Sequence, residues 1–348
     1  MTLSQQSQIA VSPDNSVFLL ADNREALFVL RTGKTAPRRI GRKGTGPGEY
    51  QRILSFGWLA DTLWLSDTGN RRLTFIDRYG GGKLRTESFI GGMTADAFTS
   101  MPLSLTTQGH ALSVLQSSYG GQNRMTAAIV EPLVRVSRER RSSWDTLMLL
   151  DIRHRNHRVL IAKGNINGRA LMSDATLWTI SRNGDFVLSV DRSDDAATKL
   201  RPVKVLLQST KRRRIYEVEF QNPRQRVTRA DVDKLVQNDV DAFNLANRTD
   251  WVPKLTADQY RSSMFVPIYR IHFTDAVVGD DGTVLLRGND WSGINVSYTW
   301  ILPNGTIRGS LAVPVSQYIR AVTSNEIWSI EERPNGEHRL IRQFVTGS

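Results

Sequence analysis

The sequence predicts an all-β fold, a six-bladed β-propeller with a helical insertion on one face. Short β-rich segments recur along the chain, separated by turns that contain Asp, Asn or Gly, and such spacing is typical of propellers, barrels and sandwiches. The segments Val17–Leu30 and Leu63–Ile76 align with each other, and related units follow at Thr283 and Glu326. One later segment has a helical period instead.

The repeats can be arranged as six units. They span about residues 9–41, 53–90, 103–162, 175–220, 269–313 and 318–345. The sixth unit shows only three strands, and we expect a segment near Thr2–Ser7 to supply the fourth. A borrowed terminal strand would close the ring and cover edges that otherwise invite aggregation. We therefore expect one domain over residues 1–348.

Two segments are too long to be simple turns. Residues 118–145 are expected to form a long loop between the second and third strands of the third unit. Residues 221–266 are expected to form a helical insertion between the fourth and fifth units. Thr228 is its predicted N-cap, with Asp231 three residues later and apolar residues at helical spacing beyond. A second short helix is predicted to begin at Thr256.

Both insertions fall in connections that share one face of a propeller, which we call the elaborated face. The opposite, short-turn face carries tight turns such as residues 182–184 and 279–282, and His154 and His157 are also placed there. Because loops on a rigid scaffold often carry function, the elaborated face is the expected working face. The alternative is that the helices only cover an apolar patch.

Composition narrows the class of partner. The chain is 40% hydrophobic and 23% charged, which is typical of a folded globular protein, and it has no cysteine for disulfides or thiolate chemistry. A net charge of +12 favours an anionic small molecule, a glycan or an acidic protein, unless it is only a solvated basic surface. Basic residues are scattered without interleaved aromatics, which disfavours nucleic acid. We expect a monomer without a transmembrane segment.

One glycine-rich motif suggests a family. Residues 41–50, Gly-Arg-Lys-Gly-Thr-Gly-Pro-Gly-Glu-Tyr, are followed by Asp67-Thr-Gly-Asn70-Arg-Arg-Leu73. This pattern resembles bacterial six-bladed β-propeller proteins related to NHL repeats. The resemblance implies a ring with a central channel and a periplasmic or extracellular location, although no signal peptide is visible at the start of the chain. The group includes interaction modules, lactonases, esterases and lyases, so the fold does not define the activity.

The strongest candidate site lies in the channel. Arg270 and His272 alternate on the predicted first strand of the fifth unit, and Arg320 holds the equivalent place in the sixth. We expect the three side chains to converge, with His272 as a general base and the arginines as anion clamps. Tyr269 and Tyr318 flank them as further ligand-binding residues.

Metal-binding signals are weak. Glu49 lies in the glycine-rich loop and is a candidate ligand-binding carboxylate, whereas Asp67 and Asn70 are expected to stabilise their own turn. The resemblance raises the possibility of a calcium ion in the channel, but the predicted first strands are poor in acids and Asp174 is the nearest candidate ligand. No HExxH or GxSxG motif occurs.

The sequence is compatible with two functions. The first is an exported binding or scaffold module that uses its loop-rich basic face to bind an anionic ligand or a protein. The alternative is a channel-centred hydrolase or lyase that acts on a carboxylated or lactone substrate.

Overall fold

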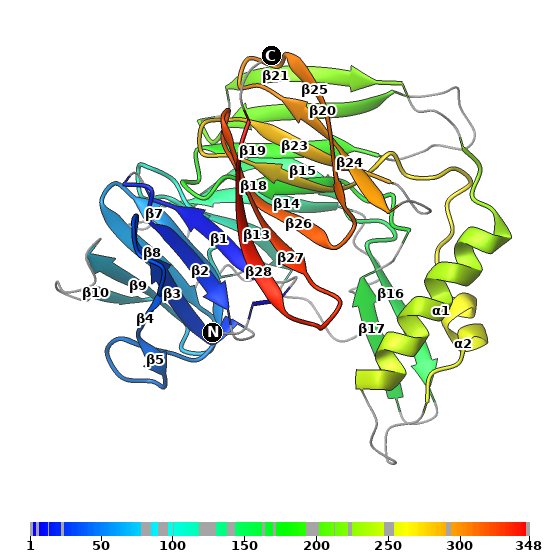
Figure 1. Ribbon diagram of the computed structural model, residues 1–348, viewed down its shortest axis with the longest axis horizontal. Coiled ribbons are helices and arrows are strands. Elements are labelled where there is room, and N and C mark those ends of the chain that lie inside the picture. Colours follow the sequence, from blue (N-terminus) through cyan, green and yellow to red (C-terminus); the bar gives the residue numbers. More distant parts are fainter. Residues whose placement is uncertain are drawn as a thin grey trace.

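The protein is a six-bladed β-propeller, as the sequence predicts (Figure 1). The computed structural model describes residues 3–4, 7–12, 14–21, 24–77, 85–89, 97–99, 101–117, 130–137, 143–161, 164–169, 172–192, 202–211, 213–221, 225–246, 254–289 and 294–345. Each blade is an antiparallel sheet whose strands follow one another in chain order.

The strands of the first three blades have the following bounds. Blade one holds β1 (Gln8–Val11), β2 (Val17–Ala21), β3 (Ala26–Leu30) and β4 (Arg38–Ile40). Blade two holds β7 (Ile53–Leu59), β8 (Thr62–Asp67), β9 (Arg72–Asp77) and β10 (Arg85–Ser88). Blade three holds β12 (Ser104–Leu105), β13 (Ala111–Ser117), β14 (Val130–Val136) and β15 (Trp144–Asp151), with β11 (Ala97–Thr99) also paired to β13.

The other three blades are arranged in the same way. Blade four holds β18 (Leu177–Ile180), β19 (Phe186–Asp191), β20 (Val203–Ser209) and β21 (Arg214–Phe220). Blade five holds β22 (Phe273–Val278), β23 (Val284–Gly288), β24 (Asn295–Ile301) and β25 (Ile307–Pro314). Blade six holds β26 (Gln317–Val322), β27 (Glu326–Glu332) and β28 (His338–Phe344).

Apolar clusters between neighbouring blades hold the ring together. Strand β2 shows the principle, because successive side chains of a strand point to opposite faces. Phe18 and Leu20 pack toward blade two, where Phe18 meets Trp58 edge to face at 4.8 Å, whereas Val17 and Leu19 pack toward blade six. Both faces of such a strand are buried, so it reads as an apolar run rather than as an alternating pattern.

The ring closes through packing between blades six and one. Leu3 is only 7% exposed and belongs to the same cluster as Trp328 and Ile330 of β27. Within the described residues, no strand pairs with the outer edge of β28. The expected closing strand near Thr2–Ser7 falls partly outside those residues, so it stays a prediction, but Leu3 shows that the N-terminal segment reaches this junction.

Blade three corrects the sequence prediction. Residues 130–136, expected to lie in a loop, form β14 and pair with both β13 and β15. The chain therefore completes the blade at Asp151 rather than near residue 162. Strands β16 (Asn156–Ile161) and β17 (Gly164–Arg169) form a separate hairpin between blades three and four. The remaining residues 118–129 lie outside the described part of the chain.

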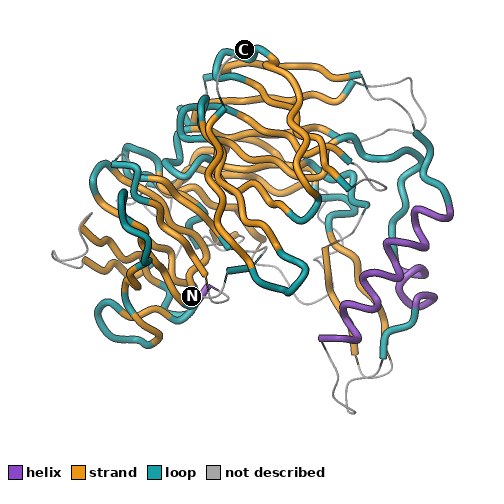
Figure 2. Tube along the Cα trace, viewed as in Figure 1, coloured by secondary structure: helices purple, strands orange, loops and turns teal. Residues whose placement is uncertain are grey.

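The predicted helical insertion is present and has its own small core. Helix α1 (Arg229–Ala246) begins after Thr228, which exchanges two hydrogen bonds with Asp231, and α2 (Ala257–Ser263) has a complete capping box at Thr256. Val236 and Val240 of α1 pack on Leu255 and Tyr260. The pair of helices lies beside the β16–β17 hairpin, at one side of a body built from strands (Figures 1 and 2). The apolar stripe of α1 thus packs within the insertion.

Candidate functional site

Arg270 ties the insertion to the ring. Strand β22 begins at Phe273, so Arg270 and His272 precede it. The Arg270 guanidinium binds Asp231 at 2.7 Å, near the N-terminus of α1, and reaches the side chain of Gln225 at 3.2 Å. Residues 225–227 run beside residues 268–270, with Tyr269 bridged to Arg226 through backbone bonds. These contacts form a clasp at the base of the insertion.

His272 lies among aromatic rings. Its ring centroid is 4.2 Å from that of Phe273 and 6.2 Å from that of Phe220. Burial lowers the pKa of His272, which favours the neutral imidazole. Arg270 and His272 therefore lie next to the insertion. Arg320, the third member of the predicted trio, contacts other residues.

Arg320 and Tyr318 share one side of β26, between blades five and six. The Arg320 guanidinium is 3.8 Å from the Asp275 carboxylate and 5.6 Å from the centroid of the Tyr318 ring. Arg287 of β23 lies at the same distance from that ring. The Arg320 side chain is 24% exposed and that of Asp275 is 43% exposed, so solvent reaches this pair.

Arg182 places a second guanidinium near Arg320. It follows β18 in blade four, yet its guanidinium donates to the Gln8 side chain of blade one at 3.0 Å and lies 5.6 Å from the Phe56 ring of blade two. Gln8 in turn donates to the Leu54 carbonyl at 3.1 Å. Side chains from blades one, two and four can meet only near the axis of the ring. Arg182 therefore reaches into the central channel.

Other charged side chains act on the pKa of Arg182. Burial lowers the pKa of Arg182 to about 10, and the positive charges of Arg320 and Arg24 add to that effect while Asp280 opposes it. Burial also lowers the pKa of Arg24, helped by repulsion from Arg52. We call Arg24, Arg182 and Arg320 the arginine cluster. Blades one, four and six each contribute one member.

The glycine-rich motif has a structural explanation. Glu49 accepts hydrogen bonds from the Gly46 backbone at 2.8 Å and from Arg42 at 2.6 Å, and these contacts lower the pKa of its carboxyl. Arg72 donates to the carbonyls of Gly46 and Glu49, and Asn70 donates to Gly44 and Asp67. The short parallel pair β5 (Arg42–Lys43) and β6 (Glu49–Tyr50) completes this arrangement. Glu49 and the turn residues thus hold the crossing between blades one and two.

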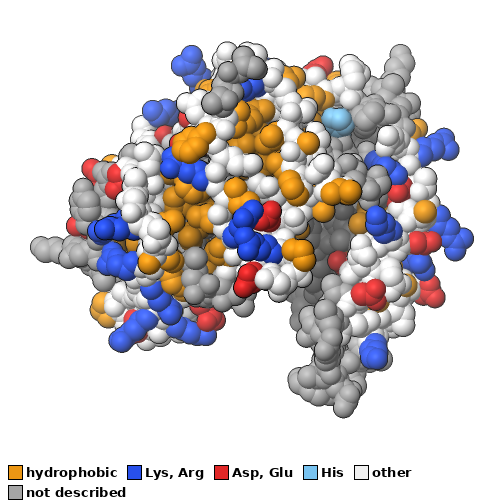
Figure 3. All heavy atoms as spheres, in the orientation of Figure 1, with side chains coloured by type: hydrophobic (Ala, Val, Ile, Leu, Met, Phe, Trp, Pro, Cys, Tyr) orange, Lys and Arg blue, Asp and Glu red, His pale blue; other side chains and the backbone are white. Residues whose placement is uncertain are grey.

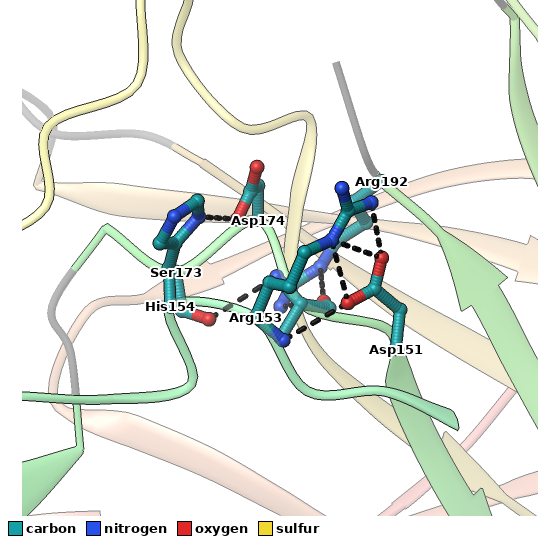
Figure 4. A network of polar contacts seen from close by, with 7 residues as sticks. Asp151, Arg153, His154, Ser173, Asp174 and Arg192 are labelled. Carbon is teal, nitrogen blue, oxygen red and sulfur yellow. Dashed lines mark hydrogen bonds and ion pairs between the residues drawn. The ribbon is translucent and has the colours of Figure 1, made fainter. Parts of the chain in front are cut away.

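His154 belongs to a network of polar contacts in the connection between blades three and four, next to the insertion (Figure 4). His154 Nδ1 is 2.9 Å from the Asp174 carboxylate, and the ring stacks on Phe265 at 3.5 Å. Nearby, Arg153 forms a fork on Asp151, and these bonds lower the pKa of Asp151 against the effect of burial. The expectation that His154 lies on the short-turn face is wrong, because β14 adds one strand and thereby reverses the direction of the chain beyond it.

The Asp174 carboxylate contacts His154. Within the described residues, no group of three or more His, Cys, Asp or Glu side chains is placed to hold a metal ion. A calcium ion at Asp174 stays a prediction. On the face of the molecule drawn in Figure 3, the Lys and Arg side chains of the described residues are scattered rather than gathered in one patch. Neither helix of the described chain has the length and apolarity to cross a bilayer.

Sequence reasoning missed two members of the arginine cluster. Arg182 stands in a tight Ser-Arg-Asn-Gly turn, which indicates the short-turn face but not the reach of a long side chain up the channel. Arg24 follows Asp22-Asn23 in a turn of blade one and has a left-handed φ of 70°. A residue that immediately follows a first strand is close to the axis, and that position is the signal that could have identified Arg182.

Comparison with known proteins gives only distant similarities. No protein-family model and no curated protein matches the chain. Solved structures with a similar shape include virginiamycin B lyase from Staphylococcus aureus, at 9% identity over 99% of this chain and 98% of that one, with a TM-score of 0.45. An exported-protein candidate from Bacteroides fragilis has 9% identity over 99% and 92%, with a TM-score of 0.48.

The Cps50 (Swd1) β-propeller domain of Myceliophteria thermophila has 10% identity over 99% and 98%, with a TM-score of 0.43. The strand order of the chain itself shows a six-bladed β-propeller.

Proposed function

We propose that this chain is an exported binding or scaffold module that holds a small anionic ligand in its channel. The observation that supports the proposal is the position of Arg182, which reaches from blade four to the Gln8 side chain of blade one and the Phe56 ring of blade two. The positive charges of Arg320 and Arg24 add to the effect of burial in lowering its pKa. Like charges that are withdrawn from water raise the energy of the empty site, and an anion between them removes that repulsion.

Ligand access fits the same proposal. Arg320 and Asp275 are partly exposed, so an anion can approach the cluster from their side of the channel. Tyr318 offers a ring between Arg287 and Arg320 that keeps both guanidiniums oriented. Arg320 is therefore the member whose removal should affect binding with the least effect on folding.

Isothermal titration with sulfate, phosphate and citrate at low ionic strength tests the proposal. Arg320→Ala should weaken binding by about tenfold, as expected for loss of one charge-assisted contact. Arg339→Ala is the matched control, because Arg339 is an exposed arginine of blade six that pairs with Glu331. Added salt should weaken binding of the unmodified protein. Absence of anion binding, or equal affinities for the two variants, would contradict the proposal.

A hydrolase or lyase for a carboxylated or lactone substrate is the second candidate function. The observation that favours it is the His154–Asp174 pair, since a carboxylate on Nδ1 orients an imidazole as a general base. A panel of esters, lactones and lyase substrates would test it, with His154→Ala and His272→Ala assayed in parallel. Turnover that survives both substitutions would exclude a histidine base at either place.

The relation to NHL-repeat propellers and the export of the protein are part of the same proposal. The glycine-rich crossing and the ring support the first, and the absence of cysteine is compatible with the second. Fractionation of cells that express the native gene would test location. Recovery only from the cytoplasm would contradict export.

A further inference from the structure

We infer that Arg287 binds the ligand directly, between blades five and six, and that the group it holds is a carboxylate with a single negative charge. This inference rests on the proposed function, because it gives the anion of that proposal a place in the structure. It adds a further binding residue and the chemical class of the bound group.

Arg287 lies in a polar row on the face of blade five that packs against blade six. It follows Leu285 by two residues on β23, so both side chains point to the same face, and Leu285 packs with Ile319 of β26. Asp275 of β22 lies directly opposite Arg287 in the sheet, and Tyr298 of β24 lies opposite it on the other side. Charged side chains therefore lie next to the apolar cluster that joins the two blades.

The Arg287 guanidinium lacks an acceptor in the part of the chain that the structure describes. Its Nε is buried without a hydrogen-bond partner, and the side chain forms no ion pair with another described residue. The side chain as a whole is half-buried, and its guanidinium carbon lies 5.6 Å from the centroid of the Tyr318 ring. A charged donor withdrawn from water without an acceptor is costly, and a bound anion would supply the acceptor.

The carboxylate opposite Arg287 is directed elsewhere. Asp275 Oδ1 accepts a hydrogen bond from the Ala276 backbone at 2.9 Å, and Oδ2 is 3.8 Å from the Arg320 guanidinium. The Asp275 side chain is also 43% exposed, so water solvates it. Asp275 therefore offsets Arg320 and leaves the charge of Arg287 to be met by a bound molecule.

Arg320 contributes to the same site from blade six. Its guanidinium carbon is also 5.6 Å from the Tyr318 ring centroid, so the two guanidinium carbons can be no farther apart than twice that distance. The Arg320 side chain is 24% exposed, and together with Asp275 it forms the side of the site that solvent reaches. An anion that enters beside Arg320 is then close to Arg287.

Charge and geometry together indicate the class of the bound group. Arg287 and Arg320 carry two positive charges and Asp275 carries one negative charge, so one negative charge on the ligand completes the balance. The planar guanidinium fork matches the two oxygens of a carboxylate. A monocarboxylate meets both conditions, whereas sulfate carries one charge more and chloride offers no pair of oxygens.

Acetate is the probe because it consists of the proposed group and little else. An NMR titration of the unmodified protein at about pH 7 and low ionic strength would follow the Nε–H signals of arginine side chains. Acetate should move the Arg287 signal in a saturable way, because its carboxylate accepts from this group. The Arg339 signal should stay in place, since Arg339 Nε already donates to Glu331 at 2.6 Å. Chloride should need a much higher concentration to move the Arg287 signal.

A conservative substitution separates the fork from the charge. Arg287→Lys keeps the positive charge but loses the paired donors, and it should weaken acetate binding by about tenfold. Arg339→Lys is the matched control and should bind acetate as the unmodified protein does. Backbone amide signals of β22, β23 and β26 would report binding in both variants.

An Arg287 signal that does not respond to acetate, or equal acetate affinity in the two lysine variants, would overturn the inference. If sulfate or citrate still binds in that case, the proposed function stands and only this inference fails. If no anion binds, both fail. If Arg287→Lys does not fold, the Nε–H titration of the unmodified protein decides by itself.

Discussion

The two faces of the propeller are joined in different ways. On the short-turn face, turns of successive blades bond directly to each other, with Thr107 donating to Asp185, Asn183 to Asp280, and Ser324 to Asp281. The elaborated face carries the glycine-rich crossing, the hairpin and the helices, each of which has strand pairing or an apolar core of its own. We therefore expect the stability of the ring to depend more on the short-turn face than on the elaborated face.

Substitution of two glycines by alanine should give the largest difference in lost stability between the ring and the elaborated face. A Cβ on Gly57 would lie 2.2 Å from the Arg182 carbonyl oxygen, between blades two and four. Gly57→Ala should destabilise the ring by about 3 kcal/mol or prevent folding, because rigid backbone must move. Gly46→Ala on the elaborated face would meet only the Glu49 carboxylate, at 3.0 Å, and should cost less than about 1 kcal/mol. Chemical denaturation measures the free energy of unfolding of both variants. Equal losses would contradict the expected difference between the ring and the elaborated face.

A charge placed inside the insertion should unfold it alone. Val236 is fully buried between the helices, so Val236→Asp should lower local stability by about 3 kcal/mol. Hydrogen exchange should become fast in α1 and α2 while the strands of the ring stay protected. Val232→Asp is the milder control, because Val232 is only partly buried. Loss of protection throughout the ring would show that the two parts are not independent.

Asp280 should make stability depend on pH. Its pKa in the folded protein, about 6, lies above its ordinary 3.8, so the ionised form disfavours folding at pH 7 and this penalty fades as the pH falls through 6. Asp280→Asn should therefore stabilise the protein at pH 7 by up to about 3 kcal/mol and by little near pH 4. Thermal unfolding at both pH values measures the difference. A destabilised variant at pH 7 would mean that attraction to Arg182 outweighs burial.

The smallest effect concerns a single turn-to-turn bond. Asp281→Ala removes the acceptor for the Ser324 and Thr283 backbones and should cost about 1 kcal/mol, because these groups can turn to water. Asp258→Ala removes only an exposed ion pair with Arg261 and should change stability by less than about 0.5 kcal/mol. Equal thermal shifts for both variants would remove the special role of the turns.

The sequence predicted most of the architecture because each blade repeats a local pattern. Strands, turns and both helix starts are encoded by neighbours within a few residues, as Thr228 with Asp231 and Thr256 with Gln259 show. Strand β14 was missed because a long, basic stretch hides its short apolar run. That one error moved His154 to the wrong face, since each strand reverses the direction of the chain.

The candidate site was harder to predict, for a physical reason. Arg320 could be placed from strand position alone, but its neighbours Arg182 and Arg24 come from other blades and from turns. Their proximity depends on how far a long side chain extends from the ring wall, which periodicity does not encode. The predicted position of Arg270 within the first strand of blade five was wrong, because the clasp at the base of the insertion delays the start of β22 to Phe273.

The clasp also bears on how the chain could be reshaped or could have evolved. Because Arg226 and Tyr269 face each other across an antiparallel bridge, the insertion leaves and re-enters the ring at nearly one point. A segment with adjacent ends can be gained, exchanged or deleted as one module without stretching its host. Joining residue 225 to residue 270 through a short turn should give a plain propeller, and the same point is a place to graft foreign sequences.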